Sequence, residues 1–526
     1  MPVSDYTLSS RASFAHVLCT TSSAVDAIAG TALPVFDSDH DDVVFTNNTS
    51  DDITYTAAAG TFTFAKAGTY HVVLTLVASQ ETSDRPHTTT FNLNSAAAIY
   101  TAAPFADFAM DPTETTHQRI ITIAADDVLH IKTKTAANTM GIVKGTSVVI
   151  TEITSGVFAS STVTTAGSNN TTSAFNPFDT DLSGGPVFAT AGKIASGVIF
   201  TQTDGSMTVP SAGKYLIMIN HLFAAGGSTN SVVAMLLKKG STVLLTNTVK
   251  LHSTIDPVEH TMCVIEDLAA DDVLTVSYDI VGGQVQAELG ATFTVIKLQE
   301  GQPISGTGRG IGGYGSAYIS VVSNQDSTAG ATEVNPFDED TLTGDATFTT
   351  RTSSGITFTP AAGTFTVNDP GLYFIMHNPI LDGANDIVVT TKILVNGSIV
   401  ASSDTALIKH GTGDPANLTN TAFVELQRND VVTVLSDANT AVNLTHKLGS
   451  HITMFRYYGF FEFSDVNAVA PKLISDDLTV NTFSQENLSG QYDRNSAQVP
   501  FKFGVRGPGT LRGRGTNPSV VKLGDS

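Results

Sequence analysis

The sequence lacks tryptophan altogether, and its 526 residues include only two cysteines, Cys19 and Cys263. Two thiols so far apart give neither a disulfide framework nor a cysteine-based metal site. Both lie in apolar, strand-like runs, so we expect unpaired thiols that pack as small hydrophobic groups. Basic residues are also few, because 27 Lys and Arg stand against 49 Asp and Glu, a net charge of −22. Such a surface repels a phosphate backbone, and no nucleic-acid partner is expected.

Long apolar runs and long helical patterns are missing as well. The longest apolar run, at 215–225, includes Asn220 and His221 and is too short to span a bilayer, so we expect no membrane insertion. The first residues, MPVSDYTLSSRASF, have no basic segment followed by an apolar one. We therefore expect no signal peptide and synthesis in a cytoplasm. What the chain does contain is short runs of Thr, Val, Ile, Phe and Tyr between Gly, Asn, Asp and Pro, which indicate β-strands.

One phrase of eleven residues occurs three times, as GTFTFAKAGTY (60–70), GSMTVPSAGKY (205–215) and GTFTVNDPGLY (363–373). Three further phrases accompany each copy: PVFD or NPFD before it, an Asp-containing turn after it, and a Gly-led strand at the end. The Asp follows the ninth-position Gly by 59 residues in every copy. The repeated positions are Gly68, Tyr70 and Asp127, then Gly213, Tyr215 and Asp272, then Gly371, Tyr373 and Asp430.

Fixed spacing of this kind predicts tandem domains. We place jelly-roll domains at 1–155, 156–300 and 314–458, with a Gly-rich linker at 301–313 and an extended C-terminal arm at 459–526. About ten short strands in each domain predict an all-β chain of antiparallel two-sheet sandwiches.

The order of these phrases resembles the C1q/TNF-like jelly-roll superfamily. The tyrosines of the first phrase match its mid-domain strand, residues 268–273 and 426–431 match its Asp-containing turn, and Gly290 to Phe293 match its last strand best. The resemblance covers about 450 residues and implies association about a three-fold axis. Two arrangements remain open: a homotrimer of chains with three stacked tiers, or one chain folded as a pseudo-trimer. The unequal linkers favour the homotrimer.

Residues from Arg494 onward contain six basic residues and one acidic residue, in contrast to the acidic body. An extended basic segment with spaced aromatic residues is typical of a docking segment that becomes ordered on a partner. A disordered tail is the alternative. The candidate docking residues are Phe501, Lys502, Phe503, Arg506, Arg512 and Arg514.

Sites for chemistry are scarce in the sequence. The alternating Asp37, Asp39 and Asp41 form a weak Ca²⁺ candidate, but the missing Gly and Glu of an EF-hand favour a solvated acidic loop. GRGIGG at 308–313 has no helix after it to hold a phosphate. His71, His221 and His377 are expected in cores or interfaces. We expect no catalytic residues, no cofactor and no enzyme activity.

Tandem jelly rolls of this acidic, Cys-poor kind resemble virion components, including capsid decoration, head-fibre and tail-fibre proteins of bacteriophages. The resemblance implies a non-enzymatic structural protein on the virion exterior, assembled in the host cytoplasm and anchored by the arm to a major capsid or tail protein. The alternative is an adhesin of the same fold that binds a receptor or host surface glycan. The absence of tryptophan argues mildly against that alternative, because sugar sites usually contain exposed aromatic residues.

Overall fold

The structure is a computed structural model of the whole chain. It describes residues 13–21, 32–38, 43–80, 85–94, 98–102, 105–106, 113–135, 140–164, 174–179, 193–225, 231–251, 258–282, 284–298, 314–321, 333–338, 347–352, 355–382, 387–407, 416–438, 444–459, 462–463 and 472–473. Apart from two short 3₁₀ turns, η1 (Ala57–Ala59) and η3 (Pro360–Ala362), the elements given below are strands.

The first sandwich contains two antiparallel sheets. Its strands are β1 (Phe14–Cys19), β2 (Leu33–Pro34), β3 (Phe45–Thr49), β4 (Ile53–Thr56), β5 (Thr61–Phe64), β6 (Gly68–Gln80), β7 (Arg85–Leu93), β8 (Ala98–Ala102), β9 (Phe105–Ala106), β10 (Thr113–Ile123), β11 (Val128–Thr135), β12 (Met140–Ile142) and β13 (Ser147–Glu152). The inner sheet has the order β10-β6-β13-β1-β3, and the outer sheet has the order β4-β5-β11-β7-β8.

The second sandwich repeats this plan. Its strands are β14 (Phe158–Thr162), β15 (Lys193–Ser196), β16 (Ile199–Thr201), β17 (Ser206–Thr208), β18 (Gly213–Ala225), β19 (Ser231–Lys239), β20 (Thr242–Leu251), β21 (Val258–Leu268), β22 (Val273–Gly282), β23 (Val285–Ala287) and β24 (Thr292–Lys297). The inner sheet is β15-β14-β24-β18-β21 and the outer sheet is β16-β17-β22-β19-β20.

The third sandwich has the same two sheets and one small extra sheet. Its strands are β25 (Tyr314–Val321), β26 (Thr347–Thr352), β27 (Ile356–Thr359), β28 (Thr364–Val367), β29 (Gly371–Asn378), β30 (Ile380–Asp382), β31 (Ile387–Val395), β32 (Ser398–Leu407), β33 (Ala416–Asn417), β34 (Asn420–Leu426), β35 (Val431–Ala438), β36 (Thr445–His446) and β37 (His451–Gly459). The inner sheet is β26-β25-β37-β29-β34, the outer sheet is β27-β28-β35-β31-β32, and β33-β30-β36 form the small sheet. Two further short strands, β38 (Glu462–Phe463) and β39 (Lys472–Leu473), pair with each other beyond it.

The strand order is the same in all three sandwiches, and the neighbours of the central strand in each inner sheet are not consecutive in sequence. This double crossing between two antiparallel sheets is the jelly-roll topology. The predicted fold class, an all-β chain of tandem jelly-roll sandwiches, is therefore confirmed for the described residues.

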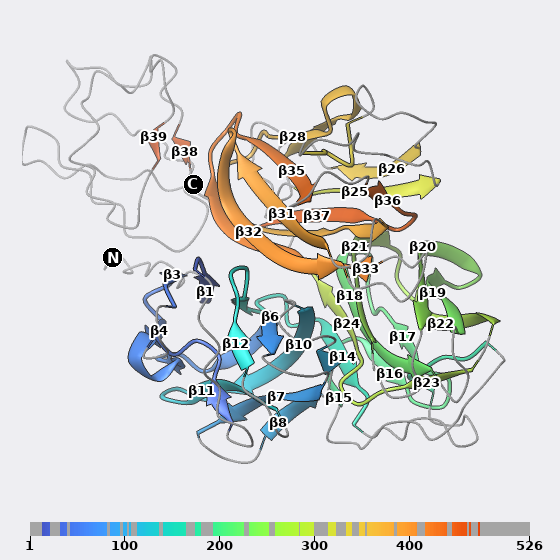
Figure 1. Cartoon of the computed structure of the whole chain (residues 1–526), viewed down its shortest axis with the longest axis horizontal. Coiled ribbons are helices and arrows are strands. Elements are labelled where there is room, and N and C mark those ends of the chain that lie inside the picture. The colour runs from blue at the N-terminus through green and yellow to red at the C-terminus, as the bar shows by residue number, and fades with distance from the viewer. Residues whose placement is uncertain are drawn as a thin grey trace, which may run out of the picture.

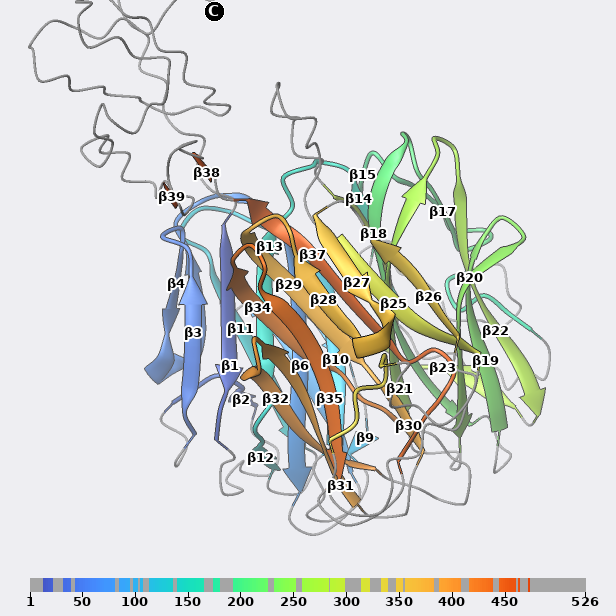
Figure 2. The ribbon, with the colours of Figure 1, turned by 90° about the horizontal axis from the view of Figure 1, so that it is seen from above.

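The three sandwiches lie side by side around a common centre (Figure 1), and their strands run in roughly the same direction (Figure 2). The inner sheets face the centre and bury one shared apolar cluster with members from all three sandwiches. The structure thus has the pseudo-trimer arrangement, the less favoured of the two expectations. Stacked tiers would pair these same faces between chains, but the sister sandwiches of one chain already cover them. The unequal linker lengths did not indicate this arrangement, because the three sandwiches are held together by side-chain contacts as well as by linkers.

Candidate functional site: the junction of the three sandwiches

Side chains alternate between the two faces of each inner strand, so an inner sheet packs into its own sandwich on one face and against the centre on the other. On β6, Tyr70, Val72 and Leu74 point into the first sandwich, whereas Val73 points to the centre. Side chains in a strand alternate between faces, so a strand that is buried on both sides must be apolar on both sides. The central cluster, here called the central junction, consists of Phe14, Val73, Val149, Leu216, Met218, Cys263, Ile265, Leu372, Phe374, Met376, Phe423 and Phe455.

The repeated tyrosines fix the turn that leads into each two-sided strand. Each is buried, and each hydroxyl donates to the carbonyl oxygen of the residue four positions earlier. The donor–acceptor distances are 3.0 Å for Tyr70, 2.7 Å for Tyr215 and 2.5 Å for Tyr373. In each repeat the tyrosine hydroxyl therefore fixes the turn that precedes its own strand. This is the physical role of the repeated phrase.

The repeated aspartates hold the next turn. Each carboxylate accepts the backbone N–H of the residue three positions earlier, at 2.7 Å for Asp127, 2.8 Å for Asp272 and 2.6 Å for Asp430. The residue before each of them has a left-handed backbone, with φ of 67°, 66° and 70°. Asp and Asn tolerate that conformation better than other side chains, which explains the choice of Asp or Asn at that position.

The PVFD and NPFD phrases form structural turns. Asn176 and Asn335 each accept the N–H of the phenylalanine two positions on, at 3.0 Å, and Phe178 and Phe337 are fully buried. The head glycine of each eleven-residue phrase packs directly against this turn. A Cβ added to Gly205 would lie 2.5 Å from the carbonyl carbon of Phe178, so the two phrases depend on each other.

The Gly-led phrase at the end of each repeat turns out to be the contact between sandwiches. Gly145, Gly290 and Gly449 have equivalent places before β13, β24 and β37, with φ of 100°, 104° and 93°. An added Cβ would lie 2.6 Å from Ser403, 2.5 Å from Ala102 and 2.6 Å from the Thr246 carbonyl oxygen. Each glycine therefore meets the outer sheet of the next sandwich, and we call the three contacts seams 1–2, 2–3 and 3–1 after the sandwiches they join.

Seam 1–2 is bridged by many polar groups. Glu259 accepts the Thr116 N–H at 2.7 Å and an Asn220 N–H at 2.9 Å, and Asn220 also donates to the Thr116 carbonyl oxygen. Three more bonds cross the seam: Gln118 to the Met218 oxygen (2.8 Å), Arg119 to Thr162 (2.5 Å) and Tyr100 to the Gly290 oxygen (3.0 Å). Burial raises the pKa of the Glu259 carboxyl well above its usual value.

Seam 2–3 centres on Cys263. The His451 Nε2 accepts the Cys263 N–H at 3.1 Å, and the Thr453 hydroxyl donates to the Cys263 carbonyl oxygen at 2.8 Å. Asn417 donates to the Thr261 carbonyl oxygen at 3.3 Å. Burial raises the pKa of the Cys263 thiol to about 12, so at neutral pH it is a neutral packing group.

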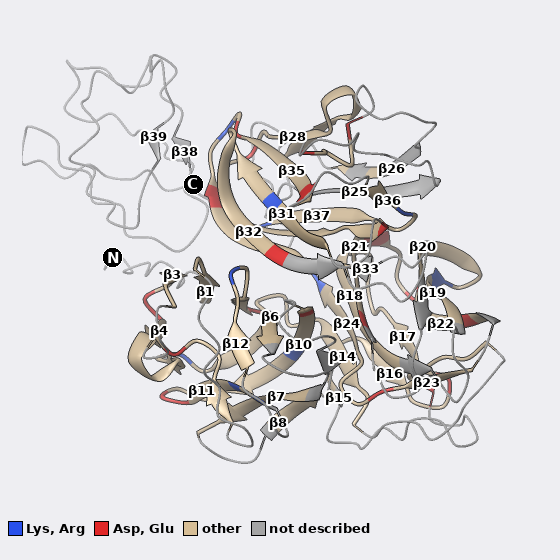
Figure 3. Ribbon diagram, viewed as in Figure 1, with Lys and Arg blue, Asp and Glu red and all other residues tan. Residues whose placement is uncertain are grey.

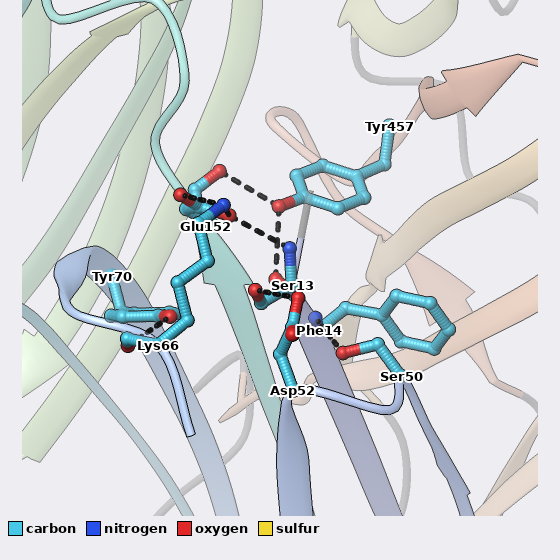
Figure 4. A network of polar contacts seen from close by, with 8 residues as sticks. All are labelled: Ser13, Phe14, Ser50, Asp52, Lys66, Tyr70, Glu152 and Tyr457. Carbon is cyan, nitrogen blue, oxygen red and sulfur yellow. Dashed lines mark hydrogen bonds and ion pairs between the residues drawn. The ribbon is translucent and has the colours of Figure 1, made fainter. Parts of the chain in front are cut away.

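Seam 3–1 joins the last strand of the ring to the first, without any linker between them. The Tyr457 hydroxyl lies 2.7 Å from the Glu152 carbonyl oxygen and 3.2 Å from that of Ser13. The Glu152 carboxylate in turn accepts the Ser13 N–H at 2.8 Å and pairs with Lys66 at 2.8 Å (Figure 4). Deeper in the seam, the hydroxyls of Ser147 and Thr421 lie 2.8 Å apart.

The strands that meet at the centre carry few charged residues (Figure 3), and buried histidines are common there instead. His71, His221 and His377 are buried as expected, and burial lowers the pKa of each. Sequence reasoning missed His16 and His451, which lie at the seams and have pKa values of about 4 for the same reason. Their only sequence signal was a place on a strand that is apolar on both faces.

Two groups of predicted residues fall wholly or partly outside the described residues. Asp37 is the last residue of the PVFD turn, but Asp39 and Asp41 are not described. No cluster of three or more His, Cys, Asp or Glu able to hold a metal occurs in the part of the chain that is described. The docking candidates Phe501, Lys502, Phe503, Arg506, Arg512 and Arg514 also lie outside it, as does the linker at 301–313. Among the described elements no helix is long and apolar enough to cross a membrane.

Three comparisons with known proteins were made, and only the search of solved structures found similarities. No family model and no curated protein matches the sequence. Among solved structures, murine APRIL at pH 5.0 is similar at 12% identity, with a TM-score of 0.19, over 28% of this chain and 98% of that one. Eiger TNF from S. frugiperda is similar at 11% identity, with a TM-score of 0.20, over 30% of this chain and 98% of that one. The strand order by itself defines the described part of the chain as tandem jelly-roll β-sandwiches.

Proposed function

We propose that the chain is a non-enzymatic structural protein of a virus particle, of the capsid decoration or fibre type. In this proposal the ring of three sandwiches projects from the particle exterior, and residues 459–526 attach it to a capsid or tail protein. The observation that carries the proposal is the place where the last inner strand ends. Tyr457, at the end of the last inner strand, bonds to Ser13, at the start of the first one. The arm therefore begins at one defined place on the ring.

The electrostatics support attachment through the arm. The whole chain has a net charge of −22, whereas residues from 494 onward carry six basic residues and one acidic residue. A strongly acidic body stays soluble and resists self-association. A basic segment beside it suits an acidic partner surface.

Removal of residues 460–526 tests this proposal, because it leaves Tyr457 and the whole of β37 in place. The truncated ring should keep its size in gel filtration and its near-ultraviolet circular dichroism, and it should be absent from purified particles. A matched control keeps the arm but changes Lys502, Arg506, Arg512 and Arg514 to Gln, and it should reduce incorporation if charge guides docking. Normal incorporation of the truncated chain would refute the proposal. Binding of the truncated ring to a glycan array would favour the adhesin alternative.

A further inference from the structure

Both seams of the third sandwich contain a buried histidine that bonds across the seam. At seam 2–3, the His451 Nδ1 lies 2.8 Å from the Gly449 carbonyl oxygen and must donate to it. Its Nε2 is therefore unprotonated, as it must be to accept the Cys263 N–H at 3.1 Å. The His451 side chain is 2% exposed, so no water replaces either partner.

At seam 3–1 the histidine comes from the first sandwich. His16 bonds to the backbone of Phe423 in the third sandwich, and the two rings lie with centroids 6.5 Å apart. The His16 Nε2 is buried and has no hydrogen-bond partner. A neutral ring tolerates this arrangement because its unprotonated nitrogen has no N–H that would need an acceptor.

Protonation of the second ring nitrogen destabilises the closed seam at both histidines. On His451 it would set an N–H against the Cys263 N–H, and on His16 it would bury an N–H that has no acceptor. An unpaired buried donor on a charged ring is costly, and opening the seam to water removes that cost. The pKa of about 4 for each ring, lowered chiefly by burial, agrees with this geometry.

No carboxylate lies among the described neighbours that would offset the charge. His451 faces Cys263 across the seam, and in its own sandwich it lies near His377, whose pKa it helps to lower together with His446. All three neighbours are neutral at pH 7. The register partners of His16 are Val149 on β13 and Asn48 on β3, and neither titrates.

Seam 1–2 responds to acid differently. His71 pairs with Gln118 within the first sandwich at 3.1 Å. The His117 Nδ1 lies 3.4 Å from the Tyr100 hydroxyl, its Nε2 is buried without a partner, and burial lowers its pKa to about 3. Glu259 contributes a carboxylate to this seam from the second sandwich, 3.9 Å from the His117 ring, and burial raises its pKa. At seam 1–2 acid therefore acts on a carboxylate and an imidazole that lie beside each other, and it neutralises the carboxylate. At the other two seams it charges a buried imidazole that has no carboxylate beside it.

We propose that mild acid releases the third sandwich from the ring by protonating His16 and His451, while the first and second sandwiches stay joined. The third sandwich precedes the arm in the chain, so its release would move the arm's root away from Ser13 and Glu152. The proposal concerns the ring itself and holds whatever the arm binds.

Linkage gives the size of the effect. With a pKa of 6.5 in the open state and about 4 in the closed state, one histidine shifts the balance toward opening by about 30-fold between pH 7.5 and pH 5. Two independent histidines shift it by about 700-fold. Above about pH 7.5 the effect is negligible, because both rings are then almost entirely neutral in either state.

The two cysteines provide the assay in the full-length protein. Cys263 lies at the central junction, whereas Cys19 lies in the core of the first sandwich. Each thiol is labelled with 4,4′-dithiodipyridine between pH 7.5 and 4.5, in single-cysteine variants Cys19→Ala and Cys263→Ala, and each rate is divided by that of glutathione at the same pH. We expect the normalised Cys263 rate to rise by at least two orders of magnitude, with Cys19 still protected.

The double variant His16→Gln/His451→Gln should remove most of that rise, because Gln keeps a polar side chain without titrating. His130→Gln, on outer-sheet strand β11, is the matched control and should leave the rise unchanged. If Cys263 and Cys19 become reactive together at every pH, the third sandwich is not released separately and the proposal is wrong. An unchanged acid rise in a folded double variant would also overturn it. If the double variant does not fold, the comparison of Cys263 with Cys19 still decides.

Discussion

Replacement of Gly290 by alanine should destabilise the ring through seam 1–2. Gly290 has φ of 104°, which strains any side-chain-bearing residue by about 1–3 kcal/mol. The new Cβ would lie 2.5 Å from the Cβ of Ala102 and 2.8 Å from its Cα. Overpacking of this kind costs about 1–3 kcal/mol more. We therefore expect Gly290→Ala to lower the free energy of unfolding by about 2–6 kcal/mol.

Gly240→Ala separates backbone strain from seam contact. Gly240 also has positive φ, 55°, but nothing lies within 4 Å of an added Cβ. It should cost only the strain, about 1–2 kcal/mol. Both variants are compared with the parent by urea unfolding, with circular dichroism and Cys263 labelling as separate probes.

A second substitution tests the stated contact directly. Ala102→Gly removes the nearest atom and should recover part of the loss in the Gly290→Ala protein, although it weakens β8 by about 0.5–1 kcal/mol on its own. The reasoning fails if Gly290→Ala costs no more than Gly240→Ala, or if Ala102→Gly adds its cost without any recovery.

Three further predictions concern single polar groups. Tyr457→Phe removes the bonds to Ser13 and Glu152 and should cost about 1–3 kcal/mol in urea unfolding; no loss would show that seam 3–1 closes without the hydroxyl. Asp272→Ala removes one turn bond at a partly exposed site and should cost about 1 kcal/mol, measured in the same way. Glu259→Gln should stabilise the protein at pH 8 and progressively less toward pH 5, because a raised carboxyl pKa means that wild-type stability is lost as pH rises above its unfolded value; an equal effect at both pH values would contradict the shift.

The fold could be predicted from the sequence because the repeated residues form hydrogen bonds with nearby backbone groups. Tyr70 and Asp127 each bond to backbone within four residues, and their counterparts do the same in the other sandwiches. Such contacts leave a fixed spacing in the sequence. Phe178 in the NPFD turn is a similar case, since its N–H bonds two residues away.

The arrangement of the sandwiches and the seams could not be predicted in this way. His451 and Cys263 are 188 residues apart, and Tyr457 and Ser13 are 444 residues apart. Neither pair leaves a local pattern, and the residues equivalent to His451 in the other sandwiches are Ser147 and Thr292. The glycines at 145, 290 and 449 are the repeated residues that lie at the seams, but their spacing alone did not show that they contact another domain.

A single chain also allows what a homotrimer does not, because three identical subunits must form three identical interfaces. Here the equivalent positions on the inner strands have diverged: Ser147 meets Thr421, His451 meets Cys263, and Gln118 bonds to the backbone of Met218. One seam is bridged by a buried carboxylate and the other two by imidazoles. The seams therefore differ in their response to pH although their backbone geometry is alike. Fusion of three sandwiches in one chain thus makes it possible for one sandwich, the one followed by the arm, to separate while the other two remain together.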